Sequence, residues 1–172
     1  MFKANMEDQS GTLTPVVVKF TPKYCRDAHA LCADAGLAPK IWFCQRLDDV
    51  GGLYIVVMDY VNSCEVETIR EYSGAVVALR QAVQLLHRND LVFGDLREPN
   101  VLVTGKDEGM MLVDFDWCGR EGEARYPCGI NLDVDSIPWH EDVRRGGEIK
   151  KDHDKWLFKI LTGEDLELDA GF

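Results

Sequence analysis

Two short polar segments, one on each side of a predicted hairpin, constrain this chain more than any other feature of its sequence. The first is residues 94–100, with the sequence GDLREPN, in which Asp95 and Asn100 stand five positions apart. The second is residues 114–116, with the sequence DFD, which begins 14 positions after Asn100. The apolar runs 101–103 and 110–114 predict two strands between them. A hairpin of this kind holds the two polar segments at a fixed separation.

The residue types in these segments suit the transfer of a phosphoryl group. Such a transfer needs a carboxylate near the attacking hydroxyl and oxygen ligands for Mg²⁺, which bridges the phosphates and neutralises developing charge. Asp95, Asn100 and Asp114 can supply all three groups. Rigid loops let such a site stabilise the transition state without reorganising. We therefore expect these residues to hold a metal ion and nucleotide phosphates.

The N-terminal part of the chain predicts a small antiparallel sheet with one inserted helix. The helix covers residues 24–35, where apolar residues recur at helical spacing, and Gly36 ends it. Alternating or β-branched runs predict four strands, at residues 2–6, 16–20, 39–47 and 53–60. Residues 48–52, with the sequence DDVGG, join the last two strands as a hairpin.

After Asn62 the pattern becomes mainly helical. Residues 66–70 predict a short helix, and residues 75–87 and 153–161 predict longer ones. Residues 119–151 are irregular, with prolines and a glycine pair. The expected fold class is therefore α+β, with a small lobe at 1–61 and a large, mainly helical lobe at 62–172.

Composition excludes several classes of function. The net charge of −11 disfavours nucleic-acid binding; it is consistent with a basic or cationic partner and equally with plain solubility. No apolar run is long enough to cross a membrane, and residues 1–10 do not resemble a secretory signal, so we expect a protein of the cytoplasm or nucleus that is not secreted. The six cysteines contain no C-x-x-C pair, and the four histidines lack H-x-x-x-H spacing, so we expect no zinc site.

At this point the chain resembles the protein-kinase-like superfamily. Residues 94–100 resemble its catalytic loop with the D-x-x-x-x-N pattern, and residues 114–116 stand where its D-F-G motif belongs. Three further segments fit in the family's order: the V-A-I-K strand at 16–19, the linker to adenine at 58–61, and the start of an anchoring helix at 153–156. The resemblance covers roughly residues 2–165. Within the superfamily the sequence is similar to compact kinase-like proteins of fungi, and Phe93-Gly94-Asp95 resembles the His-Gly-Asp of choline and aminoglycoside kinases.

The resemblance implies a role for each matching residue. Asp95 orients the acceptor hydroxyl and takes its proton, and Arg97 contacts the transferring phosphate. Lys19 contacts the α- and β-phosphates of ATP, paired with Asp27 on the helix. Asn100 and Asp114 bind Mg²⁺, while Asp116 is either a further acid beside the metal or an ordinary loop acid. The adenine-binding residues implied are Val17, Met58, Asp59, Val61 and Leu102. Asp154 is expected to be buried and to accept backbone N–H groups of Phe93 and Gly94.

The chain also departs from the family. Its opening resembles the strand that follows the glycine-rich loop, so the phosphate lid is absent from this sequence. Phe93-Gly94 replaces the His-Arg pair, and no A-P-E segment follows. We therefore expect a truncated kinase-like fold and two functional alternatives. The first is an ATP- and Mg²⁺-dependent phosphotransferase acting on a protein or small-molecule hydroxyl; the second is a nucleotide-binding or scaffolding pseudokinase without turnover.

Overall fold

The computed structural model describes residues 1–105, 109–133 and 137–167. Its strands are β1 (Phe2–Glu7), β2 (Leu13–Thr21), β3 (Ile41–Leu47), β4 (Leu53–Asp59), β5 (Leu91–Val92), β6 (Val101–Gly105), β7 (Gly109–Leu112) and β8 (Gly119–Arg120). Its α-helices are α1 (Arg26–Asp34), α2 (Ser73–Arg88) and α3 (Lys151–Thr162). Short 3₁₀ turns stand at Asp48–Val50, Ile69–Glu71 and Glu98–Asn100. The fold is a mixed α/β arrangement with a small antiparallel sheet, as the sequence predicts.

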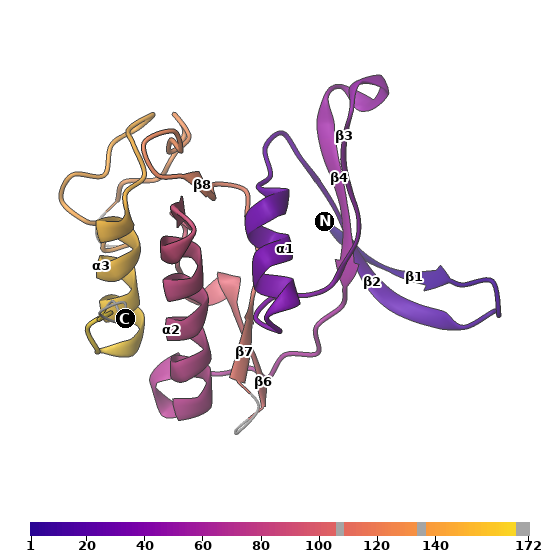
Figure 1. Ribbon diagram of the computed structural model, residues 1–172, viewed down its shortest axis with the longest axis horizontal. Coiled ribbons are helices and arrows are strands. Elements are labelled where there is room, and N and C mark those ends of the chain that lie inside the picture. Colours follow the sequence, from indigo (N-terminus) through magenta and orange to yellow (C-terminus); the bar gives the residue numbers. More distant parts are fainter. Residues whose placement is uncertain (106–108, 134–136, 168–172) are drawn as a thin grey trace.

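The four-stranded sheet has the order β1-β2-β4-β3, and all its neighbours are antiparallel. Helix α1 lies between this sheet and α2 (Figure 1). In the register of β2 and β4, Lys19 stands opposite Val56 and Val17 stands opposite Met58. Residues opposite each other share a face of a sheet, and so do residues two apart in a strand. Val17, Lys19 and Met58 therefore point to the same side.

Two small strand pairs flank the polar segments. Strands β6 and β7 form the hairpin between residues 94–100 and residues 114–116, and β5 pairs with β8. The backbone N–H of Val113 donates to the carbonyl oxygen of Asn100 over 3.0 Å. This bond joins the end of β7 to the Glu98–Asn100 turn, and it places Asn100 next to the residue before Asp114.

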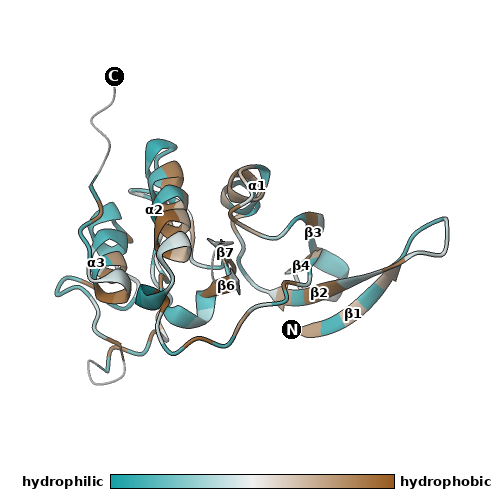
Figure 2. Cartoon of the chain, turned by 90° about the horizontal axis from the view of Figure 1, so that it is seen from below, coloured by the Kyte–Doolittle hydropathy of each residue, from teal (hydrophilic) through white to brown (hydrophobic). Residues whose placement is uncertain are grey.

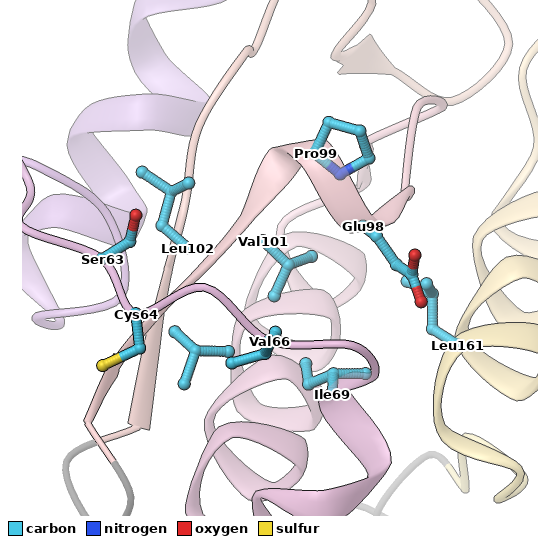
Figure 3. A pocket seen from close by; sticks show the side chains of 10 residues that line it. Ser63, Cys64, Val66, Ile69, Glu98, Pro99, Val101, Leu102 and Leu161 are labelled. Carbon is cyan, nitrogen blue, oxygen red and sulfur yellow. The ribbon is translucent and has the colours of Figure 1, made fainter.

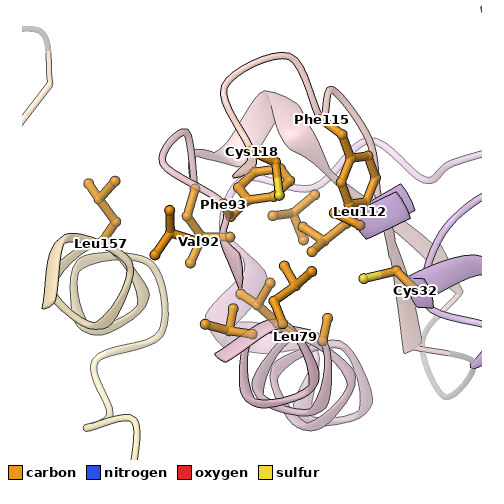
Figure 4. Packing of buried hydrophobic residues seen from close by; sticks show 14 of the residues in the cluster. Cys32, Leu79, Val92, Phe93, Leu112, Phe115, Cys118 and Leu157 are labelled. Carbon is orange, nitrogen blue, oxygen red and sulfur yellow. The ribbon is translucent and has the colours of Figure 1, made fainter. Parts of the chain in front are cut away.

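The hydrophobic core lies around one face of α2. Leu79, Ala82, Val83 and Leu86 of this helix are completely buried. Hydrophilic and hydrophobic residues fall on different sides of the helices (Figure 2), as an amphipathic pattern requires. Figure 4 shows Leu79 below Phe93 and Cys118, with Phe115 and Cys32 to one side. Fully burying one such aliphatic side chain stabilises the fold by about 1.5–3 kcal/mol.

Phe115 links the polar segment 114–116 to helix α1. Its ring stacks on His29 with centroids 4.7 Å apart and meets Phe93 edge-on at 5.3 Å. The Phe115 carbonyl oxygen also accepts the backbone N–H of Cys25 over 3.0 Å. Each aromatic pair of this kind contributes about 0.5–1.5 kcal/mol beyond its buried area. The apolar middle residue of the D-F-D sequence is therefore a core residue, and the acids on either side of it remain at the surface of the core.

The expectation of a short helix at residues 66–70 is wrong. Residues 66–70 form no α-helix; only a 3₁₀ turn at Ile69–Glu71 is present. The Thr68 hydroxyl accepts the backbone N–H of Arg70 over 3.4 Å, a local bond that competes with helix formation. The Arg70 guanidinium in turn binds the carbonyl oxygens of Ile160 and Leu161 at the end of α3. Tertiary contacts thus override a short and weak helical pattern.

Among the described residues, no helix combines the length and the apolar character that crossing a bilayer demands.

Candidate active site

The structure brings Lys19 of β2 to the two acids of the D-F-D segment. Its ammonium nitrogen lies 2.6 Å from Asp114 Oδ1 and 2.7 Å from Asp116 Oδ1. Lys19 is 8% exposed, so its charge is compensated by these two carboxylates rather than by water. Thr21, two residues along β2, donates its hydroxyl to Asp116 Oδ2 over 2.8 Å. Burial raises the pKa of the Asp116 carboxyl, and the hydrogen bond from Lys19 opposes that rise.

The backbone at Asp114 has a left-handed conformation, with φ of 70°. Residues other than glycine rarely adopt this region, where a side chain costs roughly 1–2 kcal/mol, although Asp and Asn tolerate it best. The left-handed conformation turns the chain sharply after β7, so that Phe115 enters the core while Asp114 faces Lys19. Such strain persists where surrounding contacts fix it and is common at functional sites.

Asp95 is held by two neighbours in its own loop. The Arg97 guanidinium binds both of its carboxylate oxygens, through Nε to Oδ1 and through Nη2 to Oδ2 over 2.7 Å. Asn100 Nδ2 donates to Asp95 Oδ2 over 2.9 Å and to the Asp95 carbonyl oxygen over 2.8 Å. The hydrogen bonds to Asp95 raise the pKa of the Arg97 guanidinium, and the charges of Asp95 and Asp114 add to the rise. Asp95 and Asn100 are both buried, so their positions are well defined.

Asp154 of α3 fixes the start of this loop from beneath, as the sequence predicts. It is completely buried. Its Oδ2 accepts the backbone N–H of Phe93 and its Oδ1 accepts that of Gly94, both over 2.8 Å. Oδ2 also lies 3.0 Å from Nε2 of His87 in α2, a partner that sequence reasoning missed. A carboxylate that satisfies two buried amide donors holds residues 93–95 in place.

A cavity of about 420 Å³ adjoins these groups. Lys19, Asn100 and Asp114 form its polar side. All the residues expected to bind adenine line it: Val17, Met58, Asp59, Val61 and Leu102. Cavities of this size are typical of small-molecule sites, with apolar walls and a few polar groups at one end. Asp95 and Arg97 are not among the lining residues; they lie in the same loop as Asn100.

The structure does not bring Asp27 to Lys19. Asp27 is exposed on α1, and the carboxylates that contact Lys19 are Asp114 and Asp116. The side of α1 that faces the core carries Ala28, His29 and Cys32 instead. Buried His29 occupies this space through hydrogen bonds to Tyr24 and to the Pro39 carbonyl oxygen. The expected pairing fails because Asp27 falls on the solvent side of the helix.

An aromatic cluster beside Arg97 was not expected from the sequence. The guanidinium carbon of Arg97 lies 5.9 Å from the Trp117 ring centre and 5.8 Å from that of Trp139. Tyr126 packs against both tryptophans. Cation–π contacts of this kind fix the position of a guanidinium. Trp117 directly follows the D-F-D segment, and Tyr126 and Trp139 come from the irregular residues 119–151. No periodicity in these parts of the chain predicts the contact.

A second pocket, of about 260 Å³, shares Ser63, Pro99 and Leu102 with the first. Figure 3 shows Ser63, Cys64 and Leu102 on one side of it and Glu98 with Leu161 on the other. Glu98 is the sole charged residue among those that line it. It therefore extends the first cavity with mainly apolar surface and one carboxylate.

Comparisons with known proteins support the fold. No family model matches the chain, and no curated protein sequence matches it. Among solved structures, the chain is similar to the kinase PK-1 of Cydia pomonella granulovirus, with a TM-score of 0.61 and 18% sequence identity. The similarity covers 92% of this chain and 63% of the viral kinase, so the chain spans less than two thirds of that protein. At this identity the likeness shows a kinase-like fold.

Proposed function

We propose that this chain is an ATP- and Mg²⁺-dependent phosphotransferase with a truncated, two-lobed kinase-like fold. Residues 1–61 would form the small lobe and residues 62–172 the large lobe, with the cavity between them. The observation that carries the proposal is the pairing of Lys19 with Asp114 beside an apolar cavity, next to the Asp95–Asn100 loop. Three segments far apart in the sequence contribute to this grouping: β2, the Glu98–Asn100 turn and the turn after β7.

The residues present fit a magnesium ion. Mg²⁺ prefers oxygen ligands and usually takes one or two from the protein, the rest from phosphate and water. The Asp114 side chain is 41% exposed, so a carboxylate oxygen is accessible. Asn100 donates its side-chain hydrogen bonds through Nδ2, which directs Oδ1 away from Asp95. Asn100 Oδ1 and the Asp114 carboxylate would hold the ion.

The cavity would hold a nucleotide with its phosphates beside Lys19, Asn100 and Asp114. Val17 and Leu102 would enclose the adenine ring, with Met58 behind it. The backbone N–H groups of Asp59 and Tyr60 already donate to Lys40 and Pro15, so Val61 is the linker residue left to bind the base edge. Lys19 has three ammonium hydrogens and can bind a phosphate oxygen while it keeps a carboxylate partner.

Asp95 and Arg97 would act on the acceptor. Bound ATP would supply the phosphoryl group, and Mg²⁺ would neutralise the charge on the phosphates. Asp95, held by Asn100, would orient an acceptor hydroxyl and receive its proton, which contributes typically 10²–10⁴-fold to such reactions. Arg97 would stabilise the transferring phosphate. The acceptor is a hydroxyl of a protein or small molecule, and the net charge of −11 favours a basic one.

One observation favours the alternative, a nucleotide-binding or scaffolding pseudokinase. Arg97 binds both oxygens of Asp95 in a bidentate pair, so neither oxygen is free to bind an acceptor hydroxyl. Binding would then persist without turnover.

Calorimetric titration tests the proposed binding site. The parent chain should bind ATP with Mg²⁺ and much more weakly with a chelator in place of Mg²⁺. Asp114→Ala should abolish the Mg²⁺-dependent binding because it removes a metal ligand. Asp95→Ala is the matched control, and it should bind ATP nearly as the parent does. If Asp114→Ala binds like the parent, these residues do not form a nucleotide site and the similarity is one of fold alone.

A further inference from the structure

Three potential metal ligands meet away from the candidate active site. His140 and Asp142 belong to the irregular segment after residue 137, and His153 is the third residue of α3. His140 Nδ1 lies 2.9 Å from Asp142 Oδ1, and His153 Nε2 lies 3.6 Å from the same oxygen. All three ligand atoms lie within 4.8 Å of one another. The expectation that no histidine serves a zinc site rested on helical spacing, and a loop that folds back onto a helix does not need that spacing.

His153 Nε2 is an unsatisfied polar atom in this cluster. The residue is 1% exposed, and Nε2 is buried without a hydrogen-bond partner. Asp142 Oδ1, at 3.6 Å, is too distant for a hydrogen bond. Leaving a buried polar atom without a partner is costly, so each instance calls for an explanation. This unpartnered nitrogen is the His153 atom that lies 3.6 Å from Asp142 Oδ1.

The neighbours of the cluster also suit a metal ion. His153 Nδ1 lies 3.1 Å from the Tyr126 hydroxyl and 3.3 Å from the backbone N–H of Lys150. When the proton is on Nδ1, His153 donates to the Tyr126 hydroxyl oxygen and no longer accepts the backbone N–H of Lys150. The lone pair of Nε2 is then available to a metal ion. Outer contacts of this kind orient metal-bound histidines. The Lys150 ammonium lies 2.5 Å from Asp142 Oδ2, so Oδ1 remains the oxygen directed at both imidazoles.

We propose that His140 Nδ1, Asp142 Oδ1 and His153 Nε2 bind a divalent transition-metal ion of the zinc class. Two imidazoles with one carboxylate suit zinc better than the oxygen-seeking Mg²⁺ or Ca²⁺. Tetrahedral zinc, with bonds of about 2.0–2.2 Å, sets ligand atoms roughly 3.3–3.5 Å apart. The 3.6 Å separation is slightly above this range, and the 2.9 Å separation would widen by about half an ångström on binding.

The site is accessible, and its position gives it a structural role. The side chains of His140 and Asp142 are 27% and 37% exposed, which leaves a route for the ion and a position for water as the fourth ligand. The ion would tie the segment after residue 137 to the first turn of α3. Asp154, which holds the loop at Phe93 and Gly94, is the next residue along that helix. The inference does not depend on the proposed nucleotide site.

Zinc titration of the whole chain tests this inference. The exposed thiols Cys64 and Cys128 are first replaced by serine, because thiolates would bind zinc on their own. The chain with both cysteines replaced serves as the parent. It is titrated with zinc sulfate in competition with a chromophoric chelator and should bind one equivalent of zinc. His140→Ala and Asp142→Asn should each weaken binding by at least about 10–100-fold, the effect of losing even an outer contact. His153 is left unchanged because its burial makes misfolding a competing explanation.

Asp152→Asn is the matched control. It makes the same carboxylate-to-amide change in α3, on a 68% exposed side chain that pairs with Lys155, and it should leave zinc affinity unchanged. Cobalt(II) gives an independent readout, because a four-coordinate site absorbs visible light far more strongly than hydrated cobalt. The inference is overturned if the parent binds no zinc, or if His140→Ala and Asp142→Asn bind it as tightly as Asp152→Asn.

Discussion

Replacing Asp154 by alanine should destabilise the chain more than any change to a surface acid. The substitution leaves the buried N–H groups of Phe93 and Gly94 without acceptors and removes the contact to His87 Nε2. An unsatisfied buried donor costs about 1–3 kcal/mol, and hydrogen bonds to charged groups contribute about 1.5–3 kcal/mol each. Because the surrounding chain relaxes in part, we expect a total loss of about 3–5 kcal/mol in the free energy of unfolding.

Urea unfolding followed by tryptophan fluorescence measures this loss, and a thermal melt should show a fall of about 10 °C at 2–4 °C per kcal/mol. Asp154→Asn keeps one acceptor oxygen and should lose only about 1–3 kcal/mol. Asp152→Ala is the control, since its exposed pair with Lys155 is worth at most about 1 kcal/mol. If Asp154→Ala unfolds at the same urea concentration as Asp152→Ala, the carboxylate does not anchor the loop and this reasoning is refuted.

Two further predictions concern the packing around the site. Gly94 has φ of 79°, and a Cβ there would lie 2.8 Å from Ile149 Cδ1, so Gly94→Ala should lose about 2–4 kcal/mol of stability by urea unfolding; Gly122→Ala, with φ of 86° and open space, should lose only about 1 kcal/mol, and equal losses would contradict the close contact. Burial lowers the pKa of His29 to about 4. The unfolded chain then binds the extra proton between pH 6.5 and 4, so stability should fall as the pH drops through that window, by about 3 kcal/mol, and His29→Gln should remove this part of the pH dependence. A parent and variant with parallel pH profiles would show that His29 is not the group responsible.

The motif spacings predicted those parts of the site that depend on local chain geometry. The five-residue interval from Asp95 to Asn100 lets one turn close on itself, and the hairpin between Asn100 and Asp114 carries Asp114 back to that turn. Asp154 was predicted through the resemblance, since nothing local in α3 indicates that its carboxylate is buried. The small antiparallel sheet followed from period-two patterns.

The parts that sequence reasoning missed depend on contacts between distant segments. Asp27 was the expected partner of Lys19, whereas Asp116 was expected to be an acid beside the metal or an ordinary loop acid. The rotation of α1 and the turn at Asp114 decide that Asp116 contacts Lys19 and Asp27 does not. The rings of Trp117 and Trp139 lie beside Arg97, and neither comes from a segment whose sequence has a helical or strand periodicity. The same holds for His140 and His153, which stand 13 residues apart and meet only because the loop folds back.

Transfer of labelled γ-phosphate from ATP tests the central claim most directly. The parent, assayed with Mg²⁺ against water, small amino alcohols and basic proteins as acceptors, should show slow release or transfer of label. Asp95→Ala should bind ATP as before and lower that rate by about 10²–10⁴-fold, the usual contribution of a positioned proton acceptor. A parent that binds ATP and Mg²⁺ but transfers no label to any acceptor would contradict the phosphotransferase proposal and leave the pseudokinase as the function.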